Sequence, residues 1–444
     1  MFRRILIGNR GEVGARVLRT CRRLGIEAVA AASESDQKLS WLAEADEVAR
    51  LPGPPRQAYL DPSALIDAAR AHRCAAIHPG WGFLSENARY AARCASSRIT
   101  FIGPPPAAMR VMGNKLSARA QMSRFGVPVL PGSEGVVADA AQARLLADTI
   151  GYPVLLKARS GGGGRGMRKV YNAAELPDAF SQATAEALSS FGDGALFMEK
   201  LVIGGRHIEF QVFGDSFGNV VCLGERECSV QRRHQKLLEE SPSPVVTPEL
   251  RARMGLMVAD ACRAVGYQSA GTVEMLRDQD GSLYFLEMNT RLQVEHPVTE
   301  LVTGLDLVEL QLRGAANEVV KPEYQTRGHA IECRINAEDP DADFRPSPGR
   351  VSRLSLPEGE GIRVDTHIRQ GDSISPHYDS MIAKILVHAP DRPTAIARMR
   401  AALDAAVVEG VPTTIGLHRR ILAHPRFVAG DYDTSLLDSG WETT

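Results

Sequence analysis

The segment from Tyr284 to His296 concentrates side chains that suit phosphate chemistry on a divalent cation. Read with a period of two, as in an extended chain, its residues separate onto two sides. One side carries Leu286, Met288, Thr290, Leu292 and Val294, and the other carries Glu287, Asn289, Arg291, Gln293 and Glu295. A surface strand also alternates, but carboxylates and amides beside a guanidinium combine metal-ligand oxygens with a forked anion donor. Because strands rarely run this long, the alternation past Asn289 is compatible with a loop.

A carboxylate on a neighbouring predicted strand extends this site. Glu274 lies in the run Thr272–Leu276, which is too apolar for a fully solvated strand, so its carboxylate needs a partner or a metal ion. Magnesium prefers hard oxygen ligands and keeps contact with substrate phosphates. We expect Glu274, Glu287 and Asn289 to hold one or two Mg²⁺ ions; the alternative is a pair of exposed glutamates.

A glycine-rich turn offers a second phosphate contact. Strands predicted at 153–158 and 167–171 are joined by a turn that contains Gly161–Gly164, where backbone N–H groups can approach an anion without a Cβ in the way. Alone, the turn would be interpreted as a flexible loop. With Lys157 and Lys115 in reach of a nucleotide cleft, a lid over phosphates is the better interpretation. The segment lacks the GxxxxGK[ST] spacing, which argues against a P-loop fold.

The basic segment Gln231–Lys236 is a third candidate anion site. Short basic clusters are usually solvated surface, and nucleic-acid binding is another alternative. The 444-residue chain has a net charge of −1, which gives no general support for nucleic-acid binding. A site for a small anionic substrate fits the cluster better.

The composition is that of a multidomain globular enzyme. Hydrophobic residues make up 44% and charged residues 24% of the chain, and its length predicts two to four domains. No apolar run approaches membrane-spanning length, and no secretory signal opens the chain. The seven cysteines are odd in number and lack CxxC spacing, so we expect reduced thiols in a cytoplasmic protein. For Cys228 a structural role is favoured over a catalytic one.

The predicted elements divide the chain into three parts. Residues 1–112 alternate strands and helices, which predicts a doubly wound α/β domain. Residues 113–318 hold the glycine hairpin, with a lid at about 130–203, and residues 328–438 predict a compact α+β unit. In that last unit, a helix from Pro393 is expected to bury Ile396, Met399, Leu403 and Val407.

Taken together, a series of segments resembles the biotin carboxylase family, and the segments follow one another in order along essentially the whole chain. They are Gly8–Glu12, His78–Asn87, Met112–Lys115, Lys157–Ala158 with Gly161–Met167, Met198–Lys200, Arg206–Glu209, Glu227–Lys236, Glu287–His296 and Glu332–Glu338. The blocks at 227–236 and 287–296 are highly specific. The resemblance implies an N-terminal α/β domain, a central ATP-grasp fold with a mobile glycine-rich lid, and a C-terminal α+β domain.

The resemblance also implies a reaction. A ligase of this family phosphorylates bicarbonate with ATP to give carboxyphosphate, and the CO₂ released from it is captured by N1′ of biotin. The implied cofactors are ATP, Mg²⁺ (or Mn²⁺) and biotin. The sequence contains no Ala-Met-Lys-Met segment, so biotin is expected on a separate biotin carboxyl carrier protein, with carboxyltransferase subunits as further partners. A homodimer that serves acetyl-CoA carboxylase in fatty acid synthesis is the expected context.

Carried over residue by residue, the resemblance assigns the sites. ATP would be bound by Lys115, Lys157, Gly163, Gly164, Glu199, Lys200, Leu201, Val202, His207, Gln231, His234, Glu274 and Glu287. Of these, Glu199 to Val202 would contact adenine through backbone groups. The metal would be bound by Glu274, Glu287 and Asn289. Bicarbonate and biotin would be bound by Lys236, Arg291, Gln293, Val294, Arg334 and Trp81. The implied catalytic residues are Arg291, Glu295, Lys236 and Arg334.

The implied roles leave two points open. Glu295 would deprotonate bicarbonate, for which a raised pKa helps, whereas the nearby cations lower that pKa, so the net direction is not predicted. Trp81 stands where the family more often has tyrosine, which leaves the shape of the acceptor pocket open. Alternatives are an ATP-grasp enzyme that activates a carboxylate toward an amine, and a non-catalytic nucleotide-binding scaffold. The scaffold is disfavoured because Lys236, Glu287, Arg291 and Glu295 are all retained.

Overall fold

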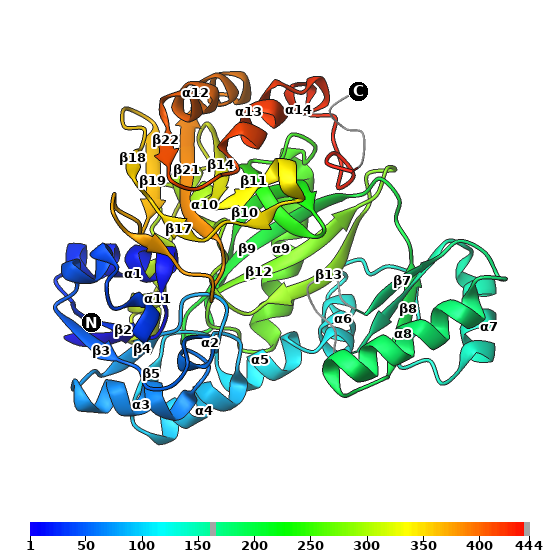
Figure 1. The fold of residues 1–444 in the computed structure, drawn as a ribbon. Helices are drawn as coiled ribbons and strands as arrows, with labels where there is room; N and C mark the ends of the chain where they lie inside the picture. Colours follow the sequence, from blue (N-terminus) through cyan, green and yellow to red (C-terminus); the bar gives the residue numbers. More distant parts are fainter. Residues whose placement is uncertain (160–165, 439–444) are drawn as a thin grey trace.

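Residues 1–112 of the computed structural model form the expected doubly wound α/β unit, drawn in blue to cyan in Figure 1. The structure describes residues 1–159 and 166–438. Five parallel strands lie in the order β3-β2-β1-β4-β5. The elements are β1 (Arg4–Ile7), α1 (Gly11–Leu24), β2 (Glu27–Ala32), β3 (Glu47–Arg50), α2 (Pro55–Ala58), α3 (Pro62–Ala71), β4 (Ala76–His78), α4 (Ala88–Ser96), β5 (Thr100–Phe101) and α5 (Pro106–Met112).

Strand β3 was not predicted, and its position in the sheet explains why. It lies at the edge of the sheet, and of its four residues only Ala49 is buried. Strand β2 lies inside the same sheet and buries five of its six residues, the near-continuous apolar run typical of a parallel strand. An edge strand with one buried residue carries no such signal.

A single large antiparallel sheet joins the central and C-terminal parts. Its eight strands lie in the order β13-β12-β9-β10-β11-β14-β21-β19. The central elements are α6 (Lys115–Arg124), β9 (Arg206–Gly214), β10 (Val220–Arg232), β11 (Gln235–Ser241), α9 (Pro248–Ala264), β12 (Ser269–Arg277), β13 (Leu283–Asn289), α10 (His296–Thr303) and α11 (Leu307–Ala315). Because β11 pairs with β14, the C-terminal unit does not stand apart as a separate sheet but extends the central one.

The C-terminal part contributes three strands to this sheet and packs helices on it. Its elements are β14 (His329–Asn336), β15 (Glu338–Asp339), β16 (Arg345–Pro346), β17 (Gly349–Arg350), β18 (Arg353–Ser355), β19 (Ile362–Thr366), β20 (Ser373–Ile374), β21 (Met381–Ala389), α12 (Arg392–Ala405), β22 (Val407–Glu409), α13 (Ile415–Ala423) and α14 (Pro425–Ala429). Helix α12 buries Ile396, Met399 and Leu403 as expected. Val407 was wrongly placed on this helix: the helix ends at Ala405, and Val407 begins strand β22.

The lid region projects from the body at the right of Figure 1 and has its own hydrophobic core. Its elements are α7 (Ala140–Ile150), β6 (Val154–Ala158), β7 (Met167–Val170), α8 (Leu176–Phe191) and β8 (Leu196–Lys200). The predicted hairpin is confirmed, since β6 pairs antiparallel with β7 and Lys157 lies opposite Met167. The turn glycines Gly163 and Gly164 lie outside the described residues.

The polar segment from Tyr284 to His296 is a strand only in its first half. Strand β13 ends at Asn289, residues 290–295 form a loop, and α10 begins at His296. The alternation also fails inside the strand. A β-bulge opposite Glu274 and Met275 places Leu286 beside Glu287 on the cleft side, while Phe285 and Met288 enter the core.

The centre of the large sheet should dominate the stability of the body. Phe210 on β9 is 0% exposed, whereas Phe217, in the turn after β9, is 58% exposed. We expect Phe210→Ala to destabilise the protein by about 3–5 kcal/mol, because it removes a large buried side chain and leaves a cavity. The matched variant Phe217→Ala should leave the melting temperature nearly unchanged. Thermal unfolding followed by circular dichroism measures both, and equal losses would contradict this assignment of the core.

Candidate active site

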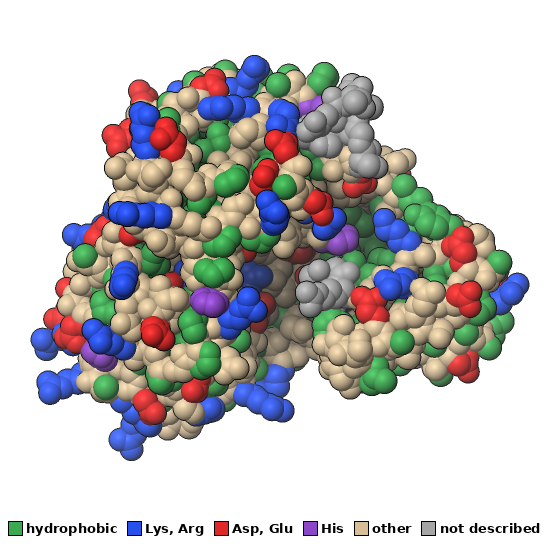
Figure 2. All heavy atoms as spheres, viewed as in Figure 1, with side chains coloured by type: hydrophobic (Ala, Val, Ile, Leu, Met, Phe, Trp, Pro, Cys, Tyr) green, Lys and Arg blue, Asp and Glu red, His purple; other side chains and the backbone are tan. Residues whose placement is uncertain are grey.

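A cleft of about 620 Å³ lies where the large sheet, the lid region, the loop after β4 and strands β14 and β21 meet. Figure 2 shows the molecule hollowed between the body and the lid region. The sequence-predicted residues that line it are Trp81, Lys115, Lys157, Glu199, His207, Gln231, His234, Lys236, Glu274, Glu287, Asn289, Arg291, Gln293, Val294, Glu295 and Arg334. The fold therefore brings together side chains that are more than 250 residues apart in sequence.

Among the described residues, three predicted ATP residues do not line this cleft. Lys200 directs its ammonium to the backbone carbonyls of Gly151 and Tyr152, at 2.9 and 3.0 Å. Leu201 and Val202 follow strand β8, and the N–H of Leu201 donates to the Pro153 carbonyl. The contacts expected of these residues were backbone contacts, so their side-chain positions do not bear on that expectation.

A row of charged residues crosses the sheet beneath the cleft. Cross-strand pairing places Glu287 opposite Glu274, Glu274 opposite Glu209, and Glu209 opposite Arg226. Like charges directly opposite one another destabilise a sheet, so three carboxylates in a row need cations. Arg226, which is fully buried, donates to Glu209 from one end of the row.

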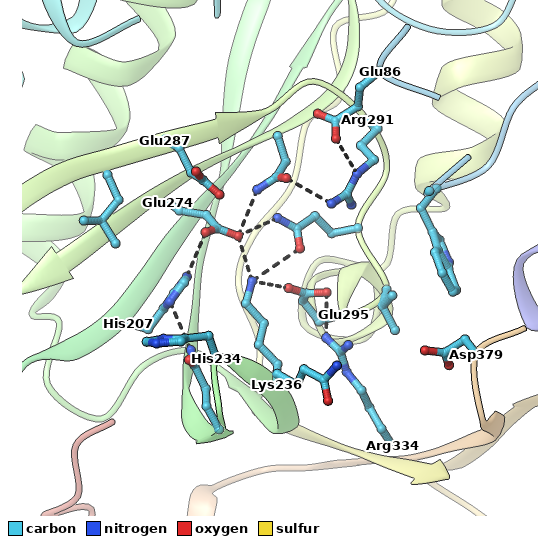
Figure 3. A pocket seen from close by; sticks show the side chains of 18 of the residues that line it. Glu86, His207, His234, Lys236, Glu274, Glu287, Arg291, Glu295, Arg334 and Asp379 are labelled. Carbon is cyan, nitrogen blue, oxygen red and sulfur yellow. Dashed lines mark hydrogen bonds and ion pairs between the residues drawn. The ribbon is translucent and has the colours of Figure 1, made fainter. Parts of the chain in front are cut away.

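Lys236 supplies the second cation and lies at the centre of the site in Figure 3. Its ammonium is 2.6 Å from Glu209, 2.9 Å from Glu274 and 2.6 Å from Glu295, and it also donates to the Gln293 side chain at 3.3 Å. Burial opposes the charged ammonium, but these three carboxylates outweigh burial and hold the pKa of Lys236 well above its usual range. Lys236 is therefore charged, and the carboxylates around it are held in place.

The turn of the β10–β11 hairpin explains how the basic segment positions Lys236. Arg233 and His234 form the turn with positive φ angles of 49° and 66°. Gln231 and Lys236 are a cross-strand pair facing the cleft, whereas Arg232 and Arg233 form ion pairs with Asp343 outside it. The basic segment is thus divided, with one part in the cleft and one part on the surface.

Glu295 is the most constrained carboxylate of the cleft. It is 1% exposed, and Arg334 donates to its second oxygen at 3.0 Å. Burial raises the pKa of Glu295, but Lys236, Arg334 and Arg226 together lower it below its usual range. The pKa direction that the sequence left open is therefore downward, which favours the ionised form of Glu295 and makes it a weak base.

Arg334 is shared between two carboxylates. The same terminal nitrogen that contacts Glu295 is 2.5 Å from Glu239, which is fully buried on β11. Burial raises the pKa of Glu239 to about 7 despite this pairing. Arg334 therefore reaches into the cleft while a buried carboxylate holds the same end of its guanidinium.

Arg291 is held in an extended position at the rim of the cleft (Figure 3). Its guanidinium donates to Glu86 at 3.1 Å and to the Asn289 side-chain oxygen at 2.9 Å. Glu86 also accepts from the backbone N–H of Thr290 at 2.9 Å, so it fixes the start of the loop as well as its arginine. Glu86 belongs to the segment His78–Asn87, and no individual role was predicted for it.

Hard oxygen ligands for a divalent cation lie on β12 and β13. Glu287 is half-exposed and 3.3 Å from the Lys115 ammonium, and Glu274 lies directly opposite it in the sheet. Asn289 donates to Glu274, so its own oxygen faces Arg291. Carboxylates of this kind suit Mg²⁺ that also contacts substrate phosphates, so the donor set fits the predicted ion.

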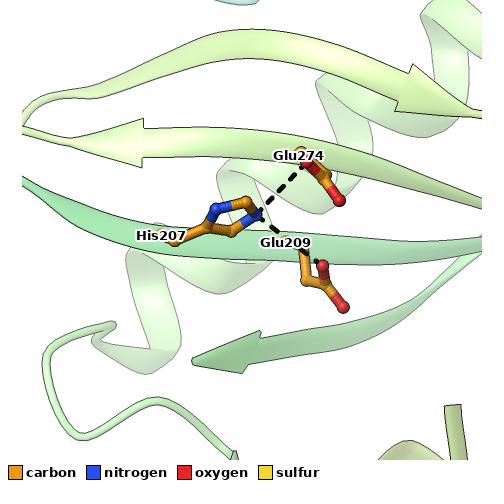
Figure 4. A group of neighbouring side chains, drawn as sticks. All are labelled: His207, Glu209 and Glu274. Atoms are coloured by element: carbon orange, nitrogen blue, oxygen red, sulfur yellow. Dashed lines mark ion pairs between the residues drawn. The ribbon is translucent and has the colours of Figure 1, made fainter. Parts of the chain in front are cut away.

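A second group of potential ligands is already neutralised. His207, Glu209 and Glu274 offer ligand atoms within 4.8 Å of one another (Figure 4). The Lys236 ammonium contacts both carboxylates of this group, and the His207 ring lies 3.4 Å from Glu274. An ammonium that already pairs with both carboxylates opposes a further cation between these three residues.

The side of the cleft nearest the lid region carries a further cationic cluster. Lys157 and Arg119 both contact the buried carboxylate of Glu199, at 2.5 and 2.7 Å. Arg119 was missed, although it lies one helical turn after Lys115 on α6 and shares its face. The i, i+4 spacing of these two basic residues is the sequence signal that could have revealed Arg119.

Asp379 and Asn336 also line the cleft, and no sequence pattern pointed to them.

The loop that presents Trp81 is fixed by the N-terminal motif. The Asn9 side chain donates to the carbonyls of Pro79 and Trp81, at 2.6 and 2.8 Å. Gly80 has a φ of 63°, and a Cβ there would lie 2.9 Å from the Asn9 side-chain nitrogen. These contacts explain a glycine and an asparagine for which the sequence pattern indicated no role.

Cys228 lies beside the cleft but is not accessible from it. Its side chain is fully buried, and burial raises the pKa of the thiol well above its usual range. All seven cysteines are free thiols. The structural interpretation of Cys228 agrees with this geometry.

Removing the Lys236 charge should change how stability depends on pH. In the wild type, the pKa values of Glu274 and Glu295 are lower in the folded than in the unfolded protein. The two ionised carboxylates therefore stabilise the fold at pH values above the pKa of an unfolded glutamate, and this stabilisation is lost on acidification. We expect Lys236→Met to cost about 3–5 kcal/mol near neutral pH, because it leaves buried carboxylates unpaired. Those carboxylates then have raised pKa values, so the loss should be larger at pH 8 than at pH 5. Melting temperatures across this range measure it, with Lys200→Met, whose ammonium contacts only carbonyls, as the control.

Three family models together match most of the chain. They are "Biotin carboxylase, N-terminal domain" at residues 1–109, "Carbamoyl-phosphate synthase L chain, ATP binding domain" at 114–322, and "Biotin carboxylase C-terminal domain" at 332–439. Among the described residues, no helix is long and apolar enough to cross a membrane.

Similar proteins match over nearly their full length. A biotin carboxylase of Nostoc sp. is 49% identical over 98% of this chain and 98% of its own. The small subunit of the 2-oxoglutarate carboxylase of Hydrogenobacter thermophilus is 46% identical over 99% of this chain and 93% of its own. The crystal structure of the biotin carboxylase domain dimer of that 2-oxoglutarate carboxylase, in complex with MgADP, ADP and bicarbonate, has a TM-score of 0.95 and 46% identity, covering 99% of this chain and 97% of that one.

These matches agree with the cleft and with the three-part architecture that surrounds it, including a central ATP-grasp domain. The resemblance noted from the sequence segments is confirmed. The chain belongs to the biotin carboxylase family and is an ATP-dependent ligase.

Proposed function

We propose that this cleft carries out the ATP-dependent carboxylation of biotin by bicarbonate, with the residue roles given below. The observation that carries the proposal is the arrangement around Glu295. A base, two cations that contact it (Lys236 and Arg334) and the Arg291 guanidinium line one cleft together with the carboxylates suited to Mg²⁺. A small planar anion bound there would meet donors on several sides and a proton acceptor.

The proton transfer fits the electrostatics of Glu295. Bicarbonate beside Lys236 and Arg334 would partly neutralise both cations, and its own negative charge would raise the pKa of Glu295 further. Glu295 thus becomes a stronger base when the substrate is present. In the proposed step a bicarbonate oxygen attacks the γ-phosphorus of ATP, the bond to the leaving ADP oxygen breaks, and the bicarbonate proton passes to Glu295.

The nucleotide would lie between the sheet and the lid region. Lys115, Lys157 and Arg119 place three cations along that side of the cleft, beside His207 and His234. Mg²⁺ on Glu274 and Glu287 would supply charge neutralisation for the phosphates. The expected backbone contacts of Glu199 to Val202 with adenine and of Gly163 and Gly164 with phosphate belong to this proposal.

The second half of the reaction would take place near Arg291, Arg334 and Trp81. Carboxyphosphate breaks its C–O bond to give CO₂ and phosphate, the phosphate accepts the N1′ proton of biotin, and N1′ attacks CO₂. Arg291 would exchange its contacts with Glu86 and Asn289 for the developing negative oxygen of the biotin ring and act as an oxyanion-type donor. Trp81 would pack against biotin with the indole, whose N–H is buried without a partner among the described residues.

We further propose biotin on a separate carrier protein, carboxyltransferase partners, a cytoplasmic location and a homodimer. The Hydrogenobacter structure is that of a domain dimer, which supports the last point. For the final acceptor we propose acetyl-CoA, as the sequence resemblance implies; the similar proteins are named both biotin carboxylase and 2-oxoglutarate carboxylase, so their names do not choose the acceptor. Reconstitution with carrier and carboxyltransferase subunits tests the acceptor, and carboxylation of pyruvate or 2-oxoglutarate in place of acetyl-CoA would overturn it.

Bicarbonate-dependent ATP hydrolysis that free biotin stimulates is the first expected result. Release of phosphate from Mg-ATP should require bicarbonate and should rise when biotin is added. A chain that binds Mg-ATP but shows no response to bicarbonate would contradict the proposed reaction. Hydrolysis that instead requires another carboxylate would indicate a different acceptor chemistry.

Arg291→Ala should separate nucleotide binding from chemistry. Its loss removes one charged donor from the reacting centre, and we expect carboxylation of biotin to fall about 10²–10³-fold. The Kd for Mg-ATP should change little, because the guanidinium contacts Glu86 and Asn289 and not the lysines of the lid side. Arg233→Ala, at an arginine 70% exposed and paired with Asp343, is the matched control. Equal losses in nucleotide binding and carboxylation would contradict the role of Arg291.

A further inference from the structure

One buried cation near the cleft has no role in the reaction described above. Lys384 lies on β21, its side chain is 0% exposed, and it does not line the cleft. Burying an ammonium costs several kcal/mol unless it is paired and hydrogen-bonded, so the partners of Lys384 indicate what it does.

Lys384 connects all three parts of the chain. Its ammonium donates to the backbone carbonyl of Val294 at 2.7 Å. It also lies 3.0 Å from the carboxylate of Glu12, whose side chain is 1% exposed. Glu12 is in the first turn of α1 and ends the segment Gly8–Glu12, which the proposed reaction leaves without a role beyond Asn9. The N-terminal helix, the loop after β13 and the C-terminal strand thus meet at one ammonium group.

The contact with Val294 fixes the direction of the following N–H group. A trans peptide is planar, so its C=O and N–H point in opposite directions. Because the Val294 carbonyl points to Lys384, the Glu295 N–H points away from it. This peptide therefore cannot rotate without breaking a buried charge-assisted hydrogen bond.

The preceding peptide is fixed in the same way by His296. Its Nδ1 lies 2.7 Å from the Gln293 carbonyl, which can only accept, so Nδ1 carries the proton. Burial and the nearby cation of Lys384 hold the pKa of His296 well below its usual range, so the ring is neutral with this one tautomer. The Val294 N–H consequently points away from His296. Within residues 1–159 and 166–438, no hydrogen bond uses the N–H of Val294 or of Glu295.

We propose that Lys384, held by Glu12, is a positioning residue that orients the Val294–Glu295 peptide so that its single backbone donor, the N–H of Glu295, serves the bicarbonate site. Val294 and Glu295 both line the cleft, beside the Lys236 and Arg334 side chains. A preoriented N–H lowers the free energy of anion binding because it needs no reorganisation when the anion arrives. The inference rests on the proposed function, and it adds two residues outside the cleft, Glu12 and Lys384, to those that shape the bicarbonate site.

A purely structural ion pair is the alternative, and kinetics separates the two. A structural pair would lower stability and affect all kinetic constants together when it is broken. A positioning residue would raise the KM for bicarbonate while the KM for ATP stays the same, because the lid-side cations are elsewhere in the cleft.

The deciding variant is the double substitution Glu12→Gln with Lys384→Met. It removes both members of the Glu12–Lys384 pair together, so the protein should fold even where Lys384→Met alone does not. In bicarbonate-dependent ATP hydrolysis, the double variant should raise the KM for bicarbonate about tenfold and leave the KM for ATP within about twofold, because only the anion loses a preoriented donor. Glu12→Gln alone keeps the ammonium on the Val294 carbonyl and should raise the bicarbonate KM by less than about threefold.

Arg251→Met is the matched control. Arg251 pairs with the buried Glu225 at 2.5 and 2.6 Å and lies outside the cleft, so its loss should lower the melting temperature without changing the bicarbonate KM. A folded double variant with the wild-type KM for bicarbonate would overturn the inference, as would equal rises in both KM values. Wild-type protein without bicarbonate-dependent hydrolysis would instead overturn the proposed function, so the two failures are distinct.

Discussion

The geometry of the cleft depends on one buried ammonium that holds three carboxylates together. Glu209 and Glu274 are neighbours in the sheet, and Glu295 enters from the loop after β13, so without Lys236 the three would repel one another at short range. Lys236 is on β11 and reaches across β10 to the two strands beyond it. The sheet order and the length of a lysine side chain together determine where the base stands.

Charged and polar residues around Lys236 and its three carboxylates stabilise this cluster. Arg226 and Arg334 add two cations, so that three cations face the three carboxylates of the cluster. Glu239 and Thr299 in turn fix those arginines from the buried side. The cluster is thus nearly balanced in charge, and the cations at its edges, Lys115, Lys157 and Arg291, are each paired with a carboxylate as well. Substrate binding therefore changes the balance of charges at Glu295.

The sequence allowed most residues of the cleft to be predicted, but not how the fold arranges them. Period-two alternation correctly picked out Glu287 and Asn289, yet the residues past Asn289 reach the cleft from a loop, and a bulge places Leu286 on the polar side. Backbone irregularities of this kind depend on pairing with a distant strand and leave no local pattern. The roles of Arg291, Gln293 and Glu295 came from the family resemblance and not from the alternation.

Residues that act through partners distant in sequence were harder to find. Glu86 and Arg291 are separated by 205 positions, and Lys384 and Val294 by 90. Each looks ordinary in its own segment, since Lys384 interrupts an apolar strand and Glu86 follows a serine in a loop. Likewise, the continuity of β11 with β14 could not be predicted from the separate patterns of the two strands. Only the folded chain shows that the C-terminal part extends the central sheet and contributes Arg334 to the cleft.

The claim that this cleft phosphorylates bicarbonate is tested most directly by following oxygen atoms. With bicarbonate labelled with ¹⁸O, Mg-ATP and free biotin, attack of a bicarbonate oxygen on the γ-phosphorus followed by C–O cleavage must leave one labelled oxygen in the phosphate. Mass spectrometry of the released phosphate should therefore show one ¹⁸O for each turnover, and Glu295→Gln should slow the appearance of that label. Phosphate whose new oxygen comes from unlabelled water would contradict the account.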